Sequence, residues 1–287
     1  MRRVSVLIAA ASTTAFTQIA SAADLPVKAP VAPVAAPYSW TGWYVGANAG
    51  GFWGHSDVTS NVPCTATSFF GPGGGYFCTT TTGLANGVAV GAAGTGSLSD
   101  SGFTGGAQAG YNRQNGNFVV GLEADIGAFH FRGSQSVSAR YPVPVIPIFG
   151  VHTFTVGTSV EANWLFTARG RIGWTVKPNL LAYATGGLAV TSLQVANSFS
   201  DDNGIPGASG AGSNSATKLG WTLGGGLEWA FDKNWSAKAE YLYVDFGSVT
   251  VNSTIFHRGP GAGYSSAIST SADLTANIVR AGINYKF

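Results

Sequence analysis

The most informative segment of the sequence reads Thr41-Gly42-Trp43-Tyr44-Val45-Gly46-Ala47-Asn48-Ala49-Gly50-Gly51-Phe52-Trp53. Apolar or aromatic residues alternate there with glycine or polar residues, which places the two classes on opposite faces of a β-strand. Trp43 and Trp53 share the apolar face. At ~3.3 Å per residue and a ~40° tilt, their separation along the barrel axis is about 25 Å, the height of the apolar band of a transmembrane β-barrel.

The same alternation recurs along the rest of the chain. It predicts eight antiparallel strands, near residues 42–53, 102–113, 118–130, 160–176, 180–195, 217–231, 235–246 and 275–287. Aromatic residues stand at both ends of several apolar rows, as in Trp164 to Trp174 and Trp235 to Tyr243. Amphipathic rings belong at the two boundaries between water and lipid, so we expect the apolar face to point outward into a membrane.

The connections between these segments alternate between short and long. Short turns are predicted at 114–117, which contains Asn115-Gly116, at 177–179 and at 232–234. The long connections are expected at 54–101, 131–159, 196–216 and 247–274. The pattern sorts all tight turns to one end, whereas a secreted sandwich has no reason to sort its loops. We therefore predict an all-β fold, an eight-stranded antiparallel transmembrane β-barrel with short periplasmic turns and long extracellular loops.

Charged residues of the predicted strands fall on the opposite, inward phase. They are four acids and four bases, namely Glu123, Asp125, Arg169, Arg171, Glu228, Lys238, Glu240 and Arg280. All lie four to eight residues from a tight turn or from the C-terminus, so we expect a belt in the periplasmic half of the lumen. Paired charges favour a structural plug, because eight strands leave an interior that side chains can fill. An ion-selective constriction is the second interpretation, and catalysis by Glu123 with Asp125 is a weaker third one.

Composition agrees with a membrane-embedded β-protein. The 287 residues include 41 glycines, and only 10% are charged against a usual ~25%. Aromatic residues make up 12%, too many for a disordered chain. No segment approaches the ~18 continuous apolar residues of a spanning helix, and we expect a helix-free fold.

The N-terminus indicates export. Arg2 and Arg3 precede the apolar run 4–11, and Ala20-Ser21-Ala22 fits a signal-peptidase site, so residues 1–22 are predicted to be a signal peptide. Residues 23–40 are predicted to be a proline-rich periplasmic leader, and residues 41–287 the barrel. Removing the signal peptide takes two of fifteen basic residues and leaves thirteen of each sign. Nucleic acid is therefore not an expected partner.

Cysteine and histidine give only weak indications of sites. Cys64 and Cys78 are predicted to form a disulfide within the first long loop, which is worth roughly 3 kcal/mol on a chain-entropy estimate. An extra hairpin inside 54–101 remains open. The histidines are His55, His130, His152 and His257. Three fall in predicted loops and one near a strand end, so haem or metal ligation is a weak hypothesis, and we predict no metal or cofactor.

Four motifs together resemble one family. They are Tyr38-Ser39-Trp40-Thr41-Gly42-Trp43-Tyr44-Val45-Gly46, Ala182-Tyr183-Ala184-Thr185-Gly186-Gly187-Leu188-Ala189, Lys238-Ala239-Glu240-Tyr241-Leu242-Tyr243-Val244-Asp245-Phe246-Gly247 and Val279-Arg280-Ala281-Gly282-Ile283-Asn284-Tyr285-Lys286-Phe287. From about residue 40 onward the chain resembles the small outer-membrane immunogenic, porin-family β-barrel proteins of Gram-negative bacteria, which share the OmpA-type barrel architecture. The resemblance implies an eight-stranded barrel whose last strand, ending in Tyr285 and Phe287, is recognised by the barrel-insertion machinery. Family members are often envelope-stabilising surface antigens, and a few are reported as porins or haem binders.

The sequence therefore predicts a protein of the cell outer membrane with a structural role in envelope integrity and a surface-exposed interaction role. Its expected partners are outer-membrane lipid, the insertion machinery and ligands of the external loops. The alternative is a narrow porin for passive diffusion of small solutes. A barrel hydrolase would need a Ser/His/Asp set at the lipid face or rim. No local motif of that kind appears, so we predict that the protein is not an enzyme.

Overall fold

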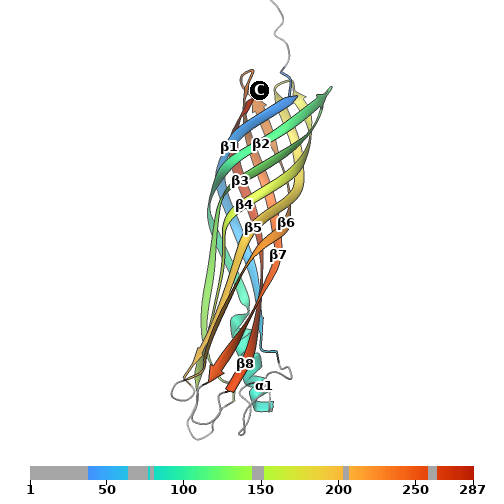
Figure 1. Cartoon of the computed structure of the whole chain (residues 1–287). Helices are drawn as coiled ribbons and strands as arrows, with labels where there is room; N and C mark the ends of the chain where they lie inside the picture. The colour runs from blue at the N-terminus through green and yellow to red at the C-terminus, as the bar shows by residue number, and fades with distance from the viewer. Residues whose placement is uncertain (1–37, 64–76, 78–80, 144–151, 203–206, 258–263) are drawn as a thin grey trace, which may run out of the picture. The chain divides into compact units, whose positions relative to one another are not determined.

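The computed structural model describes residues 38–63, 77, 81–143, 152–202, 207–257 and 264–287. These residues form one helix and eight strands (Figure 1). The elements are β1 (Gly42–Asn61), α1 (Thr81–Gly94), β2 (Gly96–Asn115), β3 (Phe118–Arg140), β4 (Thr153–Lys177), β5 (Leu180–Asp201), β6 (Ser209–Ala230), β7 (Trp235–His257) and β8 (Tyr264–Lys286). Each strand pairs antiparallel with the next, and β8 pairs with β1, so the predicted closed eight-stranded barrel is confirmed.

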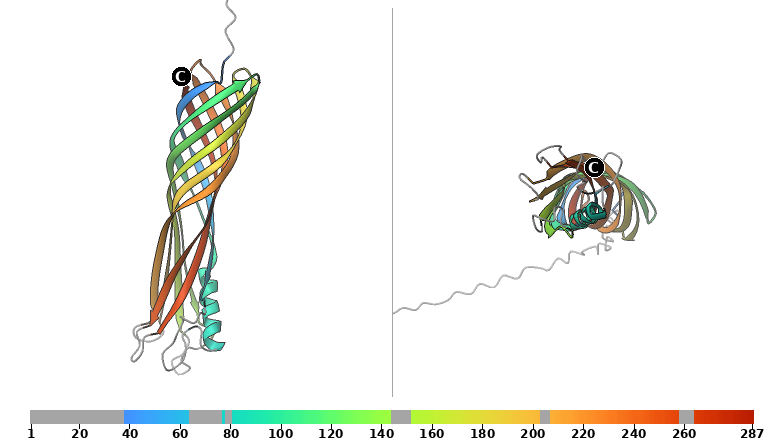
Figure 2. Two further views of the ribbon diagram at one scale, coloured as in Figure 1. Left: turned by 45° about the vertical axis from the view of Figure 1, so that its right-hand side comes forward. Right: turned by 90° about the horizontal axis from the view of Figure 1, so that it is seen from below.

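The connections are sorted between the two ends of the barrel. Residues 116–117, 178–179 and 231–234 make the tight turns, and Gly116 adopts the left-handed conformation (φ 61°) that an Asn-Gly hairpin requires. These turns lie at the end that carries the C-terminus, the short-turn end, whereas α1 lies at the opposite, long-loop end (Figure 1 and the left view of Figure 2).

The strands are much longer than the sequence analysis predicts. They run for 20 to 25 residues, although about 9–11 suffice to cross a membrane. The four long connections are therefore shorter than predicted, because strands extend into each of the expected ranges, 54–101, 131–159, 196–216 and 247–274. In these extensions the alternation persists, but small polar residues face outward in place of apolar ones, so the sequence carries no outward apolar row there.

A helix in the first long connection corrects the helix-free prediction. α1 contains no charged residue, and Gly91 and Gly94 face β1 so closely that an added Cβ would lie 3.0 Å from the Ser60 carbonyl oxygen and 2.7 Å from its Cβ. The described residues between β1 and β2 thus contain a helix rather than an extra hairpin. Within the described ranges, no helix has the length and apolar character needed to cross a membrane.

The outward direction of the apolar face is confirmed. Trp43 is 66% exposed, Trp53 58%, Trp174 56% and Trp221 48%, whereas the charged residues of the opposite phase are buried. Trp164 is only partly exposed, because β4 and β5 change register between Ala162 and Phe166. The short-turn half of the barrel therefore has an apolar outer surface and a charged interior.

Toward the long-loop end the eight strands behave as two groups of four. The ladder between β2 and β3 runs only from Thr104↔Phe129 to Asn115↔Phe118 among the described residues. The ladder between β6 and β7 is interrupted between Ser209 and Trp221. Pairing continues within the group β7-β8-β1-β2 and within the group β3-β4-β5-β6. The extended half thus has two weakly joined seams.

Candidate functional site

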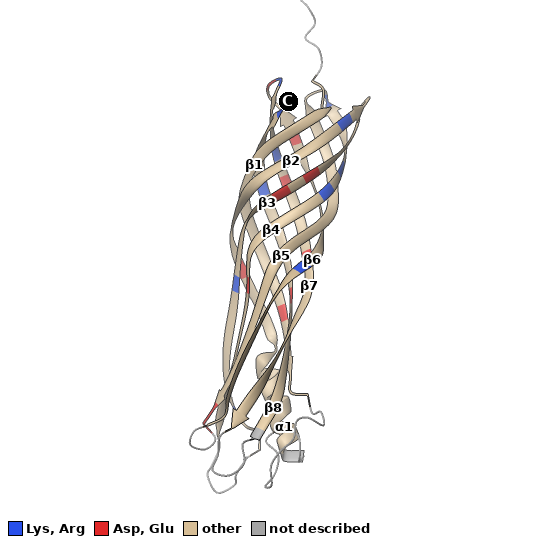
Figure 3. Ribbon diagram, viewed as in Figure 1, with Lys and Arg blue, Asp and Glu red and all other residues tan. Residues whose placement is uncertain are grey.

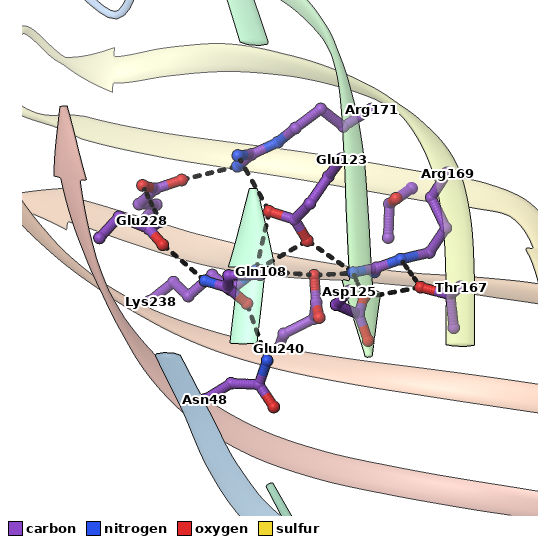
Figure 4. A network of polar contacts seen from close by, with 12 residues as sticks. Asn48, Gln108, Glu123, Asp125, Thr167, Arg169, Arg171, Glu228, Lys238 and Glu240 are labelled. Carbon is purple, nitrogen blue, oxygen red and sulfur yellow. Dashed lines mark hydrogen bonds and ion pairs between the residues drawn. The ribbon is translucent and has the colours of Figure 1, made fainter. Parts of the chain in front are cut away.

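The interior of the short-turn half brings together all eight charged residues that the sequence analysis selected. Each is at most 5% exposed. They lie on β3, β4, β6, β7 and β8, on the inward phase of each strand. Figure 3 shows how acidic and basic residues are distributed along the barrel, and Figure 4 shows how the members other than Arg280 point toward one another. We refer to these eight residues as the charge network.

Arg169 lies at the centre of this network, with its guanidinium group shared by three carboxylates. Its Nη2 is 2.5 Å from Glu123 Oε1 and 2.8 Å from Asp125 Oδ2, and its Nη1 is 3.1 Å from Glu240 Oε1 (Figure 4). Antiparallel pairing of β3 and β4 places Glu123 directly opposite Arg169. The register of one ladder therefore creates the first contact, and closure of the barrel supplies Glu240 from β7.

Arg171 lies at the centre of a second group of contacts in the network. Its Nη2 lies 2.7 Å from Glu228 Oε2, and its guanidinium carbon stands 4.0 Å from the centre of the Tyr183 ring. Nη1 of Arg171 also donates to the Tyr44 hydroxyl at 3.1 Å, and that hydroxyl donates to Glu123 at 2.7 Å. The arginine is therefore held by a carboxylate, an aromatic face and a phenol at once.

The remaining two bases complete the pairing. Lys238 Nζ lies 2.8 Å from Glu123 Oε1. Arg280 Nη1 lies 3.0 Å from Asp125 Oδ1, and Nη2 lies 2.7 Å from Glu240 Oε2. With four acids and four bases the network has no formal net charge. A buried charge is tolerated when it is paired and hydrogen-bonded, and here every member has an opposite charge within 3.1 Å.

Neutral side chains that the sequence analysis did not select complete the hydrogen bonding of the network. Thr167 Oγ1 donates to Asp125 at 2.6 Å, and Ser236 Oγ donates to Glu228 at 2.6 Å. Further inward polar side chains form a chain of hydrogen bonds from Asn48 through Gln108 and Asn284 to Glu228. Their inward phase was visible in the sequence, but their partners come from strands that meet only when the barrel closes.

An aromatic cluster lies at the short-turn mouth. Trp40 is 2% exposed and packs with Tyr38 against the inward residues Val119, Leu181, Tyr183 and Ala230. The Trp40 backbone N–H donates to Gln114 Oε1 at 2.9 Å, and Lys286 Nζ donates to the Ser39 carbonyl and lies 4.4 Å from the Tyr38 ring centre. Burial raises the pKa of the Tyr38 hydroxyl to about 12. Residues 38–40, predicted to end a leader, are thus packed into the barrel mouth.

On the other side of the charge network the interior contains two apolar clusters. One cluster includes Phe52, Phe129, Phe131 and Phe246 together with buried aliphatic residues of six strands. A second cluster, nearer α1, includes Phe77, Tyr141, Phe154 and Phe199. Phe129 and Phe131 are fully buried. In this half the apolar side chains point inward, whereas in the short-turn half they point outward. The reason is that a strand in water buries its apolar face. Phe52, Phe129 and Phe246 lie near the ends of predicted strands, whereas Phe131 and the residues of the second cluster lie in segments that were predicted to be loops. An apolar core inside the barrel was not predicted.

The other residues selected from the sequence are not brought to one place. Cys64 and Cys78 both lie outside the described residues. His55 and His257, predicted to lie in loops, lie in β1 and β7, and His152 directly precedes β4. His130, predicted near a strand end, lies within β3. At the C-terminus the rings of Tyr285 and Phe287 lie 5.3 Å apart, and Phe287 is 71% exposed. Within the described part of the chain, no group of three or more His, Cys, Asp or Glu side chains is arranged to hold a metal ion.

Comparison with known proteins agrees with this architecture. The family model described as "Outer membrane protein beta-barrel domain" matches residues 8–287. The chain belongs to this outer-membrane β-barrel family. It is 33% identical over 283 residues to the 31 kDa outer-membrane immunogenic protein of Brucella melitensis, with 95% of each chain covered. The protein is therefore located in the outer membrane.

Two further similarities have lower coverage or identity. The 22 kDa outer membrane protein of Rhizobium leguminosarum is 30% identical over 182 residues, which cover 60% of this chain and 71% of that protein. Among solved structures, Neisserial surface protein A is 15% identical, with a TM-score of 0.33, 86% of this chain covered and 98% of that one. The names of both sequence relatives describe outer-membrane proteins.

Proposed function

We propose that this outer-membrane barrel is a non-conducting structural anchor that carries its extended half to the cell surface. The observation that carries the proposal is the content of the interior at three successive levels. The cluster around Trp40, the charge network and the fully buried Phe129 and Phe131 follow one another along the barrel. An eight-stranded barrel has an interior that side chains can fill, so these three layers favour a closed lumen.

The surface role follows from the relatives and from the sorting of connections. The Brucella melitensis relative is named an immunogenic protein, which fits exposure at the cell surface. In barrels of this kind the short turns face the periplasm and the long connections face outward. We therefore assign the short-turn end to the periplasm and the strand extensions with α1 to the outside, where the external connections bind their ligands.

Conductance of the full-length protein in a planar lipid bilayer tests the closed lumen. We expect no steady conductance steps above those of the empty bilayer. The opposite outcome is steady conductance of the wild type that is lost in the double variant Arg169→Gln/Arg171→Gln. It would show that the protein is a narrow porin whose charge network forms a selectivity constriction. The matched control is Arg132→Gln/Arg140→Gln, because both of these arginines lie on β3 and are exposed.

Each protein used in the bilayer is first shown to be folded. A folded barrel migrates differently before and after boiling on a denaturing gel, and this shift serves as the entry criterion for every variant. A silent wild type that passes this criterion supports the anchor. A conducting wild type that passes it contradicts the anchor.

A further inference from the structure

Three polar side chains on the outer surface of β1 and β2 form a connected Ser–His–Asp set outside the charge network. His55 Nδ1 lies 3.1 Å from Ser99 Oγ, and His55 Nε2 lies 3.2 Å from Asp57 Oδ1. His55 and Ser99 are cross-strand partners, and Asp57 follows two residues after His55 on the same face. With the imidazole proton on Nε2, the ring donates to Asp57 and accepts the Ser99 hydroxyl proton. His55 is thus placed as a general base beside the nucleophile Ser99, and the Asp57 carboxylate orients its ring.

The position of this set relative to the membrane band indicates a class of substrate. Trp53 precedes His55 by two residues on the same outer face and is 58% exposed, and Phe103 on β2 is 68% exposed. The side chains of His55 and Asp57 are 49% and 66% exposed. The three groups thus stand one strand step beyond the aromatic boundary, at the level where lipid ester groups meet water. An acyl chain lying along Trp53 and Phe103 would place its ester at Ser99.

Backbone geometry supplies a donor for an oxyanion. Thr275 Oγ1 donates to the His55 carbonyl, so the backbone groups of His55 point toward β8, and those of its partner Ser99 point away from β1 toward β3. The N–H of Ser101, two residues on, agrees with this because it donates to Asp100 Oδ1. Along the described residues β2 pairs with β3 only from Thr104 onward. The Ser99 N–H therefore faces the β2–β3 seam, where it takes part in no described hydrogen bond of a strand ladder.

We propose that Ser99, His55 and Asp57 form a hydrolytic site for lipophilic esters at the outer boundary of the membrane. Ser99 Oγ attacks the acyl carbon while its proton passes to His55 Nδ1, and the Ser99 N–H binds the carbonyl oxygen as it becomes negative. The bond to the alcohol then breaks, and the alcohol leaves with that proton. Water then loses a proton to the same nitrogen and attacks the acyl-serine. The bond between the acyl carbon and Ser99 Oγ breaks, Ser99 Oγ takes the proton back from Nδ1, and the carboxylic acid is released. Asp57 stabilises the imidazolium through Nε2–H, and Asp273 Oδ1 holds the Asp57 N–H at 2.7 Å.

This activity is additional to the structural anchor, and it is tested independently of conductance. The full-length protein in lipid vesicles is treated with a fluorophosphonate that carries a long alkyl chain, and the modified residue is identified by peptide mass mapping. We expect Ser99 to be modified in the wild type and no modification in Ser99→Ala. In His55→Gln we expect the rate of modification to fall by about 100-fold or more. Ser97→Ala is the matched control, because Ser97 is exposed on the same face of β2, two residues away.

Turnover of p-nitrophenyl esters with long and short acyl chains tests the substrate class. We expect hydrolysis of the long-chain ester to exceed that of the acetate and to disappear in Ser99→Ala but not in Ser97→Ala. Equal modification of Ser97 and Ser99, or a His55→Gln variant that reacts as fast as the wild type, would overturn the site. A preference for the acetate would overturn the lipophilic substrate. A gel shift on boiling, as for the conductance variants, shows that each variant is folded.

Discussion

At the scale of single residues, the charge network determines what the membrane half tolerates. Arg169 has a fully buried side chain and contacts Glu123, Asp125 and Glu240. Removing one member of a buried ion-paired group leaves its partners charged in a poorly solvating interior. Such a change costs about 3–5 kcal/mol, although replacing a complete set by apolar groups can be neutral. The loss of stability therefore comes from carboxylates that remain buried without a partner, and not from the loss of a single contact.

We expect Arg169→Met to lower the free energy of unfolding by about 3–5 kcal/mol, because three carboxylates lose their shared cation. Urea-induced unfolding of the protein in lipid vesicles, followed by tryptophan fluorescence, measures this change. Arg132→Met is the control, since Arg132 is an exposed arginine on the outer face of β3. Equal destabilisation by both substitutions would contradict the central position of Arg169.

Gly116 is the second residue for which the backbone makes a prediction. Its φ of 61° favours glycine, and no heavy atom would lie within 4 Å of an added Cβ, so only the backbone opposes a side chain. We expect Gly116→Ala to cost about 1–2 kcal/mol in the same unfolding measurement. Gly170→Ala is the control, because its nearest atom would be 3.9 Å from the new Cβ and its φ is ordinary. A larger loss for Gly170→Ala would contradict the turn argument.

At the scale of elements, short segments outside the strands secure both ends of the barrel. Residues 38–40 occupy the short-turn mouth, and α1 packs on β1 at the long-loop end. Near α1, Asp202 joins the end of β5 to the start of β4. Its carboxylate accepts hydrogen bonds from the Thr153 N–H at 2.8 Å and from the Thr153 hydroxyl at 2.7 Å. These contacts fix strand ends that the ladders alone leave free to fray.

The tryptophan pair Trp40 and Trp43 separates packing inside the barrel from exposure to lipid. Trp40 is 2% exposed, whereas Trp43 is 66% exposed. We expect Trp40→Ala to lower the free energy of unfolding by about 3–5 kcal/mol, as for a buried tryptophan that leaves a cavity. Trp43→Ala, three residues along the chain, is the matched control and is expected to cost clearly less. Equal losses in urea unfolding would show that the mouth cluster adds no packing energy.

Asp202 predicts a pH-dependent stabilisation of the adjoining strand ends. The Thr153 hydroxyl, its backbone N–H and His152 hold the pKa of Asp202 below its usual value. A carboxyl with a lowered folded-state pKa stabilises above its ordinary pKa of about 4, and this contribution is lost as the pH falls through the lowered value. We expect Asp202→Ala to speed hydrogen exchange of the Thr153 amide relative to wild type at pH 7, with the ratio approaching one in acid. Asp232→Ala, in a tight turn at the other end, should leave that ratio at one at every pH.

At the scale of the whole molecule, the barrel joins two environments with opposite solvent rules. In lipid the apolar face points outward and the polar groups satisfy one another inside. In water the same strands point small polar residues outward and bury phenylalanine. The two halves share continuous strands, and the inward phase carries Arg280 and then Ile278, Ala276 and Leu274 along β8. The interior therefore changes from charged to apolar within a single strand.

Closure of the barrel through its C-terminus gives a prediction for assembly. The Phe287 N–H donates to the Trp43 carbonyl at 3.0 Å, but its ring is exposed, so its loss removes little packing. If the insertion machinery recognises the last strand, as the family resemblance implies, deletion of Phe287 will leave export and in vitro refolding nearly normal. The same deletion will strongly reduce the amount of heat-modifiable barrel in the outer membrane. Gel shifts of membrane fractions and of refolded protein measure the two quantities. Normal assembly in the membrane would contradict the assembly role of this residue.

The sequence by itself determined the strand number, the sorting of turns, the outward face and the inward phase of the eight charges. Each of these follows from period-two alternation and from local turn residues such as Asn115-Gly116, which act over a few positions. Only the tertiary structure decided which carboxylate faces Arg169, that Trp40 enters the mouth, and that Ser99 meets His55. Those contacts join residues from different strands or from outside the barrel wall, so they depend on register, stagger and closure. The tertiary structure also decided the length of the strands. In water a strand is stabilised by burial of its inward side chains, and it needs no outward apolar row that could be seen in the sequence.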